Sequence, residues 1–281
     1  MPDRGDHLQR YRELYRRQVG LKLYYTIGLM LILLALVAVS IWQTEFYDKI
    51  FITRTQWNTM VHTIRGLLHP DTSSFGFWLA KMWETVQMAL IGTLIAVAIS
   101  LPLSFFGAKN LRFSILPRPL PSLSPYHFTR MLFNLVRAVP DFVVALLLVR
   151  VTGLGPTTGI LALGIHSIGM LGKLFSEAIE AVDEGPLEAV TACGGTRWQV
   201  IMYGVMPQVS PYFTGYSLYR WDINVRSGVV LGLVGAGGIG FDFMDAVNNY
   251  RWEKASMAIV VILVTITAFD LFSSALRNRT D

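Results

Sequence analysis

The stretch Glu188–Pro207, EAVTACGGTRWQVIMYGVMP, is a compact, glycine-interrupted segment that lies between strongly apolar runs. Pro186 suits the first turn of a short helix, where its missing N–H would be unpaired anyway, and Gly194 suits the left-handed residue that closes a helix. Thr196 is placed to cap a second helix, and Gln199 follows at the spacing of a capping box. The stretch therefore predicts two short helices joined by a glycine turn, the second ended by the closing proline.

The composition of the whole chain is typical of a membrane protein. It is 53% hydrophobic and 15% charged, with a mean hydropathy of +0.46, which is more apolar than a soluble domain of this length. The net charge of +5 is modest and is a poor basis for nucleic-acid binding. The single Cys193 cannot form an internal disulfide and has no cysteine partner for a metal site. We expect an all-α polytopic membrane protein.

Six stretches are expected to cross the membrane, with both termini in the cytoplasm. The first has 20 residues without a charge, which is about 30 Å of helix. Six basic residues against three acids in residues 1–22 place the N-terminus inside, and two arginines after the last span do the same for the C-terminus. Residues 43–84 are expected outside, partly on the membrane surface. The six expected spans are 23–42, 85–106, 131–151, 159–175, 212–240 and 255–271.

The number of spans and the positions of the basic residues also decide on which side of the membrane each connecting segment lies. Residues 107–130 are basic, contain no acid and are kept extended by four prolines, so they form a cytoplasmic loop. Residues 176–211, which contain the opening stretch, are cytoplasmic as well; their acids weigh little in setting orientation. The fifth span, 212–240, has 29 residues, about 43 Å if helical, so its glycines are expected to break it near the outer side.

Two glycine-containing segments raise the question of nucleotide binding. Residues 235–240, GAGGIG, match the dinucleotide fingerprint G-x-G-x-x-G, but that fingerprint needs a strand before it and a βαβ context, which are missing. Gly172-Lys173 is not part of a P-loop, because Leu174 follows it and Ser167 stands where the first glycine belongs. Any ATP-driven work must therefore use another chain.

Ionisable residues inside spans are costly, so those present usually pair or line a wet path. Arg137 and Asp141 are four residues apart in the third span, across a kink expected from Pro140. Asp222 and Arg226 are four apart in the fifth, with the acid first, which is the better order for a helical ion pair. Both pairs are open to two interpretations, as ion pairs between packed helices or as part of a path for an anion.

Arg220 adds a charge without an evident partner, and His166 lies near the middle of the fourth span. The two arginines of the fifth span suit phosphate-like oxygens because guanidinium binds them in a planar fork. The histidine is interpreted as a packing residue in preference to a proton relay. The candidate residues of a translocation path or gate are Arg137, Asp141, His166, Arg220, Asp222 and Arg226. No catalytic constellation and no metal site are evident.

Several motifs resemble those of a known family. Glu188-Ala189, Gly194 and Pro207 have the spacing of the EAA loop of ABC-importer permeases, although Val190, Gly204 and Met206 depart from its pattern. From about residue 84 to the C-terminus the chain resembles the phosphonate ABC-transporter permease family of the PhnE type. The supporting segments are GKLFSEAIE at 172–180, YSLYR at 216–220, NVRS at 224–227 and VGAGGIG at 234–240.

The resemblance implies a type I ABC importer permease in the bacterial inner membrane, with residues 85–281 as its transmembrane domain and 176–211 as its coupling loop. It further implies a second copy of the chain, a cytoplasmic ABC ATPase dimer and an extracytoplasmic binding protein as partners, and a phosphonate or related phosphorus oxyanion as cargo. ATP and magnesium would bind the ATPase, and this chain would carry no cofactor. The residues implied to couple to the ATPase are Glu184, Glu188, Ala189, Gly194, Arg197 and Pro207.

Two other classes remain for comparison. An ATP-independent carrier or channel for anions would explain the charges inside the spans, but it would leave the acidic, docking-shaped loop without a use. A membrane-embedded enzyme would need a catalytic constellation. Copurification with an ATPase would discriminate among the three classes.

Overall fold

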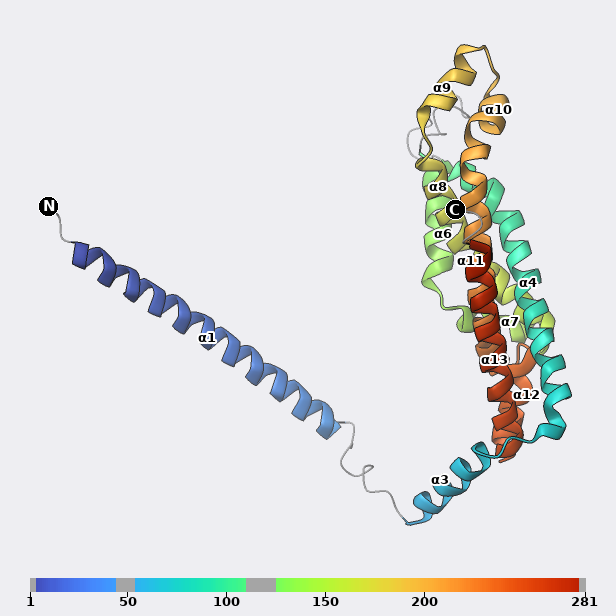
Figure 1. Cartoon of the computed structure of the whole chain (residues 1–281), viewed down its shortest axis with the longest axis horizontal. Coiled ribbons are helices and arrows are strands. Elements are labelled where there is room, and N and C mark those ends of the chain that lie inside the picture. The colour runs from blue at the N-terminus through green and yellow to red at the C-terminus, as the bar shows by residue number, and fades with distance from the viewer. Residues whose placement is uncertain (1–3, 44–53, 110–124, 278–281) are drawn as a thin grey trace. The chain divides into compact units, whose positions relative to one another are not determined.

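The computed structural model describes residues 4–43, 54–109 and 125–277, and every regular element in these ranges is a helix (Figure 1). Residues 1–3 and most of the proline-containing loop predicted at 107–130 lie outside the described ranges. The chain divides into two units, residues 1–62 and residues 63–281. We describe each unit by itself.

Helix α1, Arg4–Gln43, dominates the first unit. Its part from Tyr24 to Gln43 is long and apolar enough to cross a membrane, and none of that apolar window is buried within the chain. A helix that is apolar on all sides is suited to a lipid environment. The span expected at 23–42 falls on this stretch, whose length and composition suit a crossing.

The second unit is a helical bundle with α4, α8 and α11 at its centre (Figure 1). Helix α4, Phe75–Phe106, runs along α8, Pro156–Glu180. Small residues allow the close approach: a Cβ on Gly92 would lie only 3.1 Å from the carbonyl oxygen of Ile160. The remaining α-helices of the unit are α3, Arg54–Leu67, shared with the first unit, then α6, Pro125–Ala138, α7, Asp141–Thr152, α9, Glu184–Ala192, α10, Arg197–Gln199, α11, Met206–Gly232, α12, Gly238–Asn248, and α13, Trp252–Arg277.

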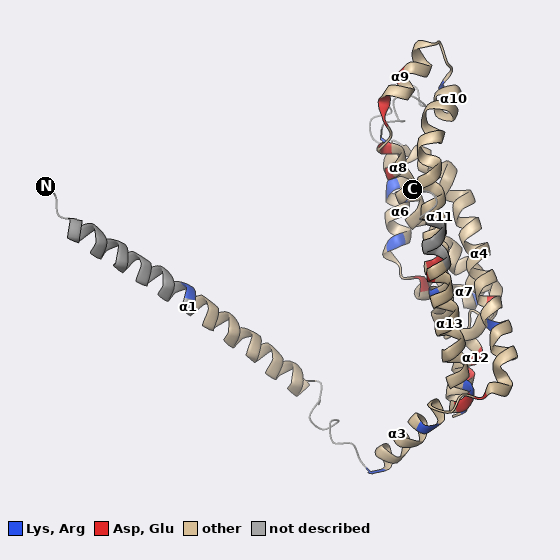
Figure 2. Cartoon of the chain, in the orientation of Figure 1, with Lys and Arg blue, Asp and Glu red and all other residues tan. Residues whose placement is uncertain are grey.

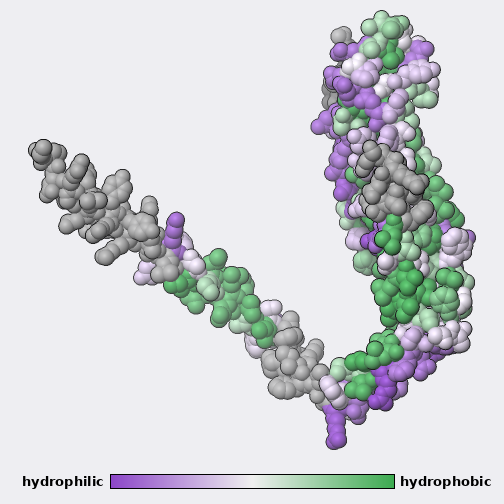
Figure 3. All heavy atoms as spheres, in the orientation of Figure 1, coloured by the Kyte–Doolittle hydropathy of each residue, from purple (hydrophilic) through white to green (hydrophobic). Residues whose placement is uncertain are grey.

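Hydropathy along the bundle fits a membrane-spanning body. Besides α1, three helical stretches of the described chain are long and apolar enough to cross, namely 72–106, Pro156–Glu180 and Trp252–Leu271. The 27 residues of α11 reach roughly 40 Å, although its charged residues make it less apolar than those three. Figure 3 shows hydrophobic residues over much of the bundle's side, with hydrophilic ones frequent at the end that carries α9 and α10.

The third predicted span is not one straight helix. Helices α6 and α7 meet at an angle of 88°, and the two together would make one broken span or a re-entrant loop. Pro140 causes the break, because it has no N–H for the helix and pushes the preceding residue out of the helical region. The kink expected at this proline is therefore a full break of the helix.

The glycine-rich segment after α11 breaks the fifth span, as predicted. Gly237 and Gly238 have φ of 79° and 70°, a left-handed region that favours glycine. The N–H of Ile239 donates to Thr85 Oγ1 at 2.9 Å, which fixes the start of α12 against α4. No strand precedes this segment in the described chain, so it has no dinucleotide-binding context.

Replacing Gly240 by alanine is expected to destabilise the bundle by about 1–3 kcal/mol, because the new Cβ would overlap the carbonyl oxygen of Val229 in α11. The thermal unfolding midpoint of the purified chain in detergent measures the loss. Gly76→Ala is the matched control, because a Cβ there meets nothing within 4 Å. Equal midpoints for the two variants would contradict the close packing of α11 on α12.

Candidate functional site

Helix α9 and the segment through η2, the π-helix Val200–Val205, form a hairpin at one end of the bundle; we call residues 183–208 the end hairpin. Asp183 caps α9 by accepting a hydrogen bond from the Gly185 N–H at 3.2 Å. Gly194 makes the turn with φ of 76°. Thr196 and Gln199 form the capping box that the sequence predicts: the Thr196 N–H donates to Gln199 Oε1 at 2.7 Å.

The end hairpin is held together by its own contacts. The Asp183 N–H donates to Gln208 Oε1 at 2.9 Å, and Gln208 Nε2 donates to the carbonyl oxygens of Asp183 and Gly204. Gly204 is buried and leaves room for Leu187, which a Cβ there would meet at 3.3 Å. These contacts join the two helical arms of the hairpin at its base, so the hairpin can move as one body.

The second helix of the end hairpin does not stop at Pro207, which corrects the prediction. Pro207 lies in the first turn of α11, directly after the π-helix η2, and the helical stretch runs without a break from η2 into α11. A π-helix has a wider turn than an α-helix and occurs often at functional sites. The end hairpin is therefore continuous with a long helix of the bundle.

The other residues predicted for the coupling loop lie on the outside of the end hairpin. Glu184, Glu188 and Ala189 of α9 are exposed, and so is Arg197 at the start of α10. Trp198, which sequence reasoning did not single out, exposes 67% of its surface. A rigid hairpin with exposed acids and an exposed aromatic side chain has the character of a protein-binding surface.

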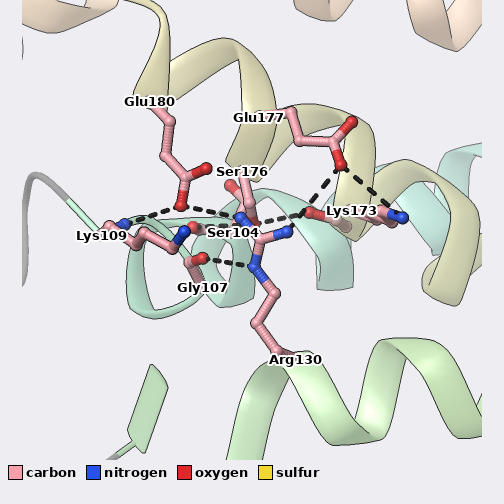
Figure 4. Close-up of polar contacts among 9 residues, drawn as sticks. Ser104, Gly107, Lys109, Arg130, Lys173, Ser176, Glu177 and Glu180 are labelled. Atoms are coloured by element: carbon pink, nitrogen blue, oxygen red, sulfur yellow. Dashed lines mark hydrogen bonds and ion pairs between the residues drawn. The ribbon is translucent and has the colours of Figure 1, made fainter. Parts of the chain in front are cut away.

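Arg130 of α6 ties three helix ends together near the base of the end hairpin (Figure 4). Its Nη2 donates to Glu180 Oε1 at 2.7 Å, and its Nε donates to the carbonyl oxygen of Gly107 at 2.9 Å. Glu180 also accepts from the Lys109 N–H at 2.9 Å. Figure 2 shows charged residues of both signs where α8 meets α9. This junction fixes α8, and with it the start of the end hairpin, to α4 and α6.

A buried polar network crosses the middle of the bundle. Arg220 of α11 is only 3% exposed. Its Nε donates to Ser167 Oγ at 2.8 Å, its Nη1 contacts Met170 Sδ at 3.0 Å, and its Nη2 lies 2.8 Å from His166 Nδ1. Because arginine carries only donors, Nδ1 of His166 must accept, so the histidine is neutral in this arrangement. Arg220, expected without an evident partner, thus has three side-chain partners on α8.

Asn224 extends the network to the third helix. Its Nδ2 donates to Thr93 Oγ1 of α4 at 2.8 Å and to Ser167 Oγ of α8 at 2.9 Å. Both Asn224 and Ser167 are fully buried. Hydrogen bonds between side chains thus join α4, α8 and α11 at one place inside the bundle.

Arg226 lies on a different face of α11 from Arg220 and Asn224, and its side chain is exposed. It pairs with Asp222 at 2.9 Å, as predicted, and its side chain is 47% exposed. The same Nη2 also contacts Asp270 of α13, which the sequence analysis missed. Asp270 is an acid inside an apolar stretch, so the rule that selected the other charged residues would have found it.

The predicted pair of Arg137 and Asp141 does not form in the described chain. The 88° break between α6 and α7 removes the helical spacing that would bring the two side chains together. Asp141 Oδ1 instead accepts from the Phe142 N–H at 2.9 Å, at the start of α7. Arg137 is exposed on α6. The structure thus brings together His166 and Arg220, and also Asp222 and Arg226. It does not pair Arg137 with Asp141.

Comparison with protein families gives one clear match. Residues 121–281 match the model of the family described as binding-protein-dependent transport system inner membrane component. The phosphite transport system permease protein PtxC of Stutzerimonas stutzeri is 37% identical over 269 residues, which are 95% of this chain and 94% of that protein. The phosphate-import permease protein PhnE of Mycolicibacterium smegmatis is 38% identical over 85% of this chain and 43% of its own length.

Solved structures give the same fold. A subunit of the MetNI methionine ABC transporter, in an inward-facing conformation, matches with a TM-score of 0.63 and 17% identity, over 75% of this chain and 99% of that one. A subunit of a bacterial alginate ABC transporter matches with a TM-score of 0.55 and 14% identity, over 87% of this chain. At such identities the likeness concerns the fold alone, which is that of a type I ABC importer permease.

Proposed function

The chain belongs to the binding-protein-dependent transport system inner membrane component family, and from this we propose that it carries a phosphorus oxyanion across the membrane. It is a multi-pass inner-membrane permease subunit of an ABC importer and not an enzyme. The likeness to a phosphite permease along 95% of the chain carries the choice of cargo, which is phosphite, a phosphonate or a related anion.

The proposed partners follow from the solved relatives, which are ABC transporters. We propose that two copies of this chain assemble with a cytoplasmic ATPase dimer, which binds ATP and magnesium, and with an extracytoplasmic binding protein. The end hairpin docks on the ATPase, and Glu184, Glu188 and Arg197 make polar contacts there. Its internal hydrogen bonds support this role, because a rigid hairpin transmits a rigid-body shift without deforming.

Arg226 is the proposed anion-handling residue of the path. Its half-exposed guanidinium offers planar donors that suit phosphate-like oxygens, whereas each nitrogen of the buried guanidinium of Arg220 contacts a side chain of α8. Arg220, His166 and Asn224 instead hold α11 against α8 and α4. Arg137 and Asp141 remain candidates, at the break between α6 and α7.

Arg226→Ala is expected to reduce uptake at least about tenfold, because the path loses its exposed guanidinium. Uptake of radiolabelled ligand into proteoliposomes that contain the complete complex measures this, with the binding protein in excess. Arg226→Lys keeps the charge but not the planar fork, and an intermediate rate is expected. Normal uptake by Arg226→Ala would assign the residue a structural role.

Copurification tests the proposal as a whole. The ATPase is expected to be retained by the tagged chain, and uptake is expected to require both ATP and the binding protein. Anion movement by the chain alone, without ATP, would instead favour a self-sufficient carrier or channel. The ligand that the binding protein retains, tested with phosphite, methylphosphonate and phosphate in turn, identifies the cargo.

A further inference from the structure

Asp270 of α13 contacts Arg226, the residue that is proposed to bind the anion. The Nη2 of Arg226 contacts Asp222 of its own helix and Asp270 of the other helix. The two acids differ in exposure: the side chain of Asp222 is 14% exposed and that of Asp270 is 48% exposed. The carboxylate that a ligand can reach is therefore the one that comes from α13.

The surroundings of these three residues do not fit lipid. Asp270 lies in the apolar stretch Trp252–Leu271, and Arg226 lies six residues before the end of α11. An ionised side chain at the centre of a membrane-spanning helix costs about 2.5–3.5 kcal/mol on insertion scales, and the side chains of Arg226 and Asp270 are about half exposed. Their open side is suited to water or to another protein surface, as a translocation path provides.

The charge of the group opposes an incoming anion. One guanidinium and two carboxylates carry a net charge of about −1 together, so an oxyanion is repelled while Asp270 is in place. Without Asp270, the remaining pair of Arg226 and Asp222 is neutral and has free N–H donors. Arg226 can then bind an oxyanion in the position that Asp270 leaves, by donating its N–H groups to the anion's oxygens.

Helices α11 and α13 also differ in what they are connected to along the chain. Asp222 is one turn away from Arg226 and moves with it, whereas Asp270 belongs to α13. Helix α11 is continuous with the end hairpin through η2. A shift of the hairpin thus moves Arg226 and Asp222 together and can separate both from Asp270.

We propose that Asp270 is a substrate-mimicking gate: its carboxylate occupies Arg226 while the path is closed, and a phosphorus oxyanion replaces it when α11 moves away from α13. This inference rests on the proposed function, since it takes Arg226 as the anion-handling residue. It adds a residue and a mechanism of closure, which keep the anion out between transport cycles.

The test uses the complete complex in proteoliposomes that are preloaded with phosphite or with inorganic phosphate, without ATP. Asp270→Asn is expected to raise the passive release of the anion about fivefold, which corresponds to ~1 kcal/mol for a half-exposed ion pair. Asp270→Glu keeps the carboxylate and is expected to restore low release. Asp245→Asn is the matched control, because it removes an exposed carboxylate that pairs with Arg251 elsewhere on the bundle.

The outcomes separate the two ideas. Release at the wild-type rate from Asp270→Asn, with normal ATP-dependent uptake, overturns the gate and leaves the proposed function intact. A parallel loss of assembly and of uptake, without extra release, also overturns it and makes the ion pair structural. If the wild-type complex takes up neither phosphite, methylphosphonate nor phosphate with its binding protein, the proposed function fails first.

Discussion

Glu188→Lys is expected to abolish binding-protein-stimulated ATP hydrolysis and uptake while the chain still inserts and folds. The residue is exposed on α9, and its side chain makes no hydrogen bond or ion pair with the described part of the chain, so the reversed charge acts on the docking partner. A charge reversal in a protein interface costs several kcal/mol when the partner group is close and desolvated. The expected loss of uptake is therefore at least about a hundredfold.

The readouts are uptake in proteoliposomes, ATP hydrolysis, and retention of the ATPase by the tagged chain. Glu253→Lys is the matched control, because it reverses an exposed acid in the first turn of α13, away from the end hairpin. Uptake by Glu188→Lys at the wild-type rate would remove this residue from the coupling surface. Loss of uptake in the control as well would point to a general charge effect.

His166→Leu is expected to destabilise the bundle by about 3 kcal/mol, more than the same change at an ordinary buried site. It removes the acceptor of Arg220 Nη2, and a buried guanidinium that loses an acceptor keeps its full desolvation cost. Arg220→Met is expected to cost less, since it removes the charge together with its need for acceptors. Unfolding midpoints of the purified chain in detergent compare the two variants.

The double variant provides the decisive comparison. If His166 acts by satisfying Arg220, adding Arg220→Met to His166→Leu should recover most of the lost stability, a coupling that a double-mutant cycle measures. Additive effects of the two changes would contradict the direct interaction. Ser217→Ala, which removes only a bond to the carbonyl oxygen of Phe213 in the same helix, controls for polar loss in α11.

Local rules predicted the end hairpin well. The capping box of Thr196 and Gln199 and the left-handed Gly194 depend on residues a few positions apart, so the sequence contains all the information they need. The end of the second helix was wrong because Pro207 is compatible with two contexts. A proline can end one helix or stand in the first turn of the next, and packing of Gly204 against Leu187 favours the continuous helix.

The charged residues inside the spans could be identified by their type, but their partners were not all predictable. The partners of Arg220 depend on how α11 is rotated against α8, which pattern and spacing do not define. The pair of Asp222 and Arg226 was predictable because it lies within one helix, whereas the contact with Asp270 joins positions 44 residues apart. The pair at Pro140 failed because the break there is sharper than an ordinary proline kink.

The break between α6 and α7 also bears on how the protein enters the membrane during synthesis. With 14 and 12 residues, the two helices reach roughly 21 and 18 Å, and neither alone matches a hydrocarbon core of about 30 Å. A translocon that tests successive segments for hydrophobicity would retain neither one by itself. Their insertion is therefore expected to depend on the emergence of α8, which packs against both, so that this part of the chain is integrated as a helical unit and not one segment at a time.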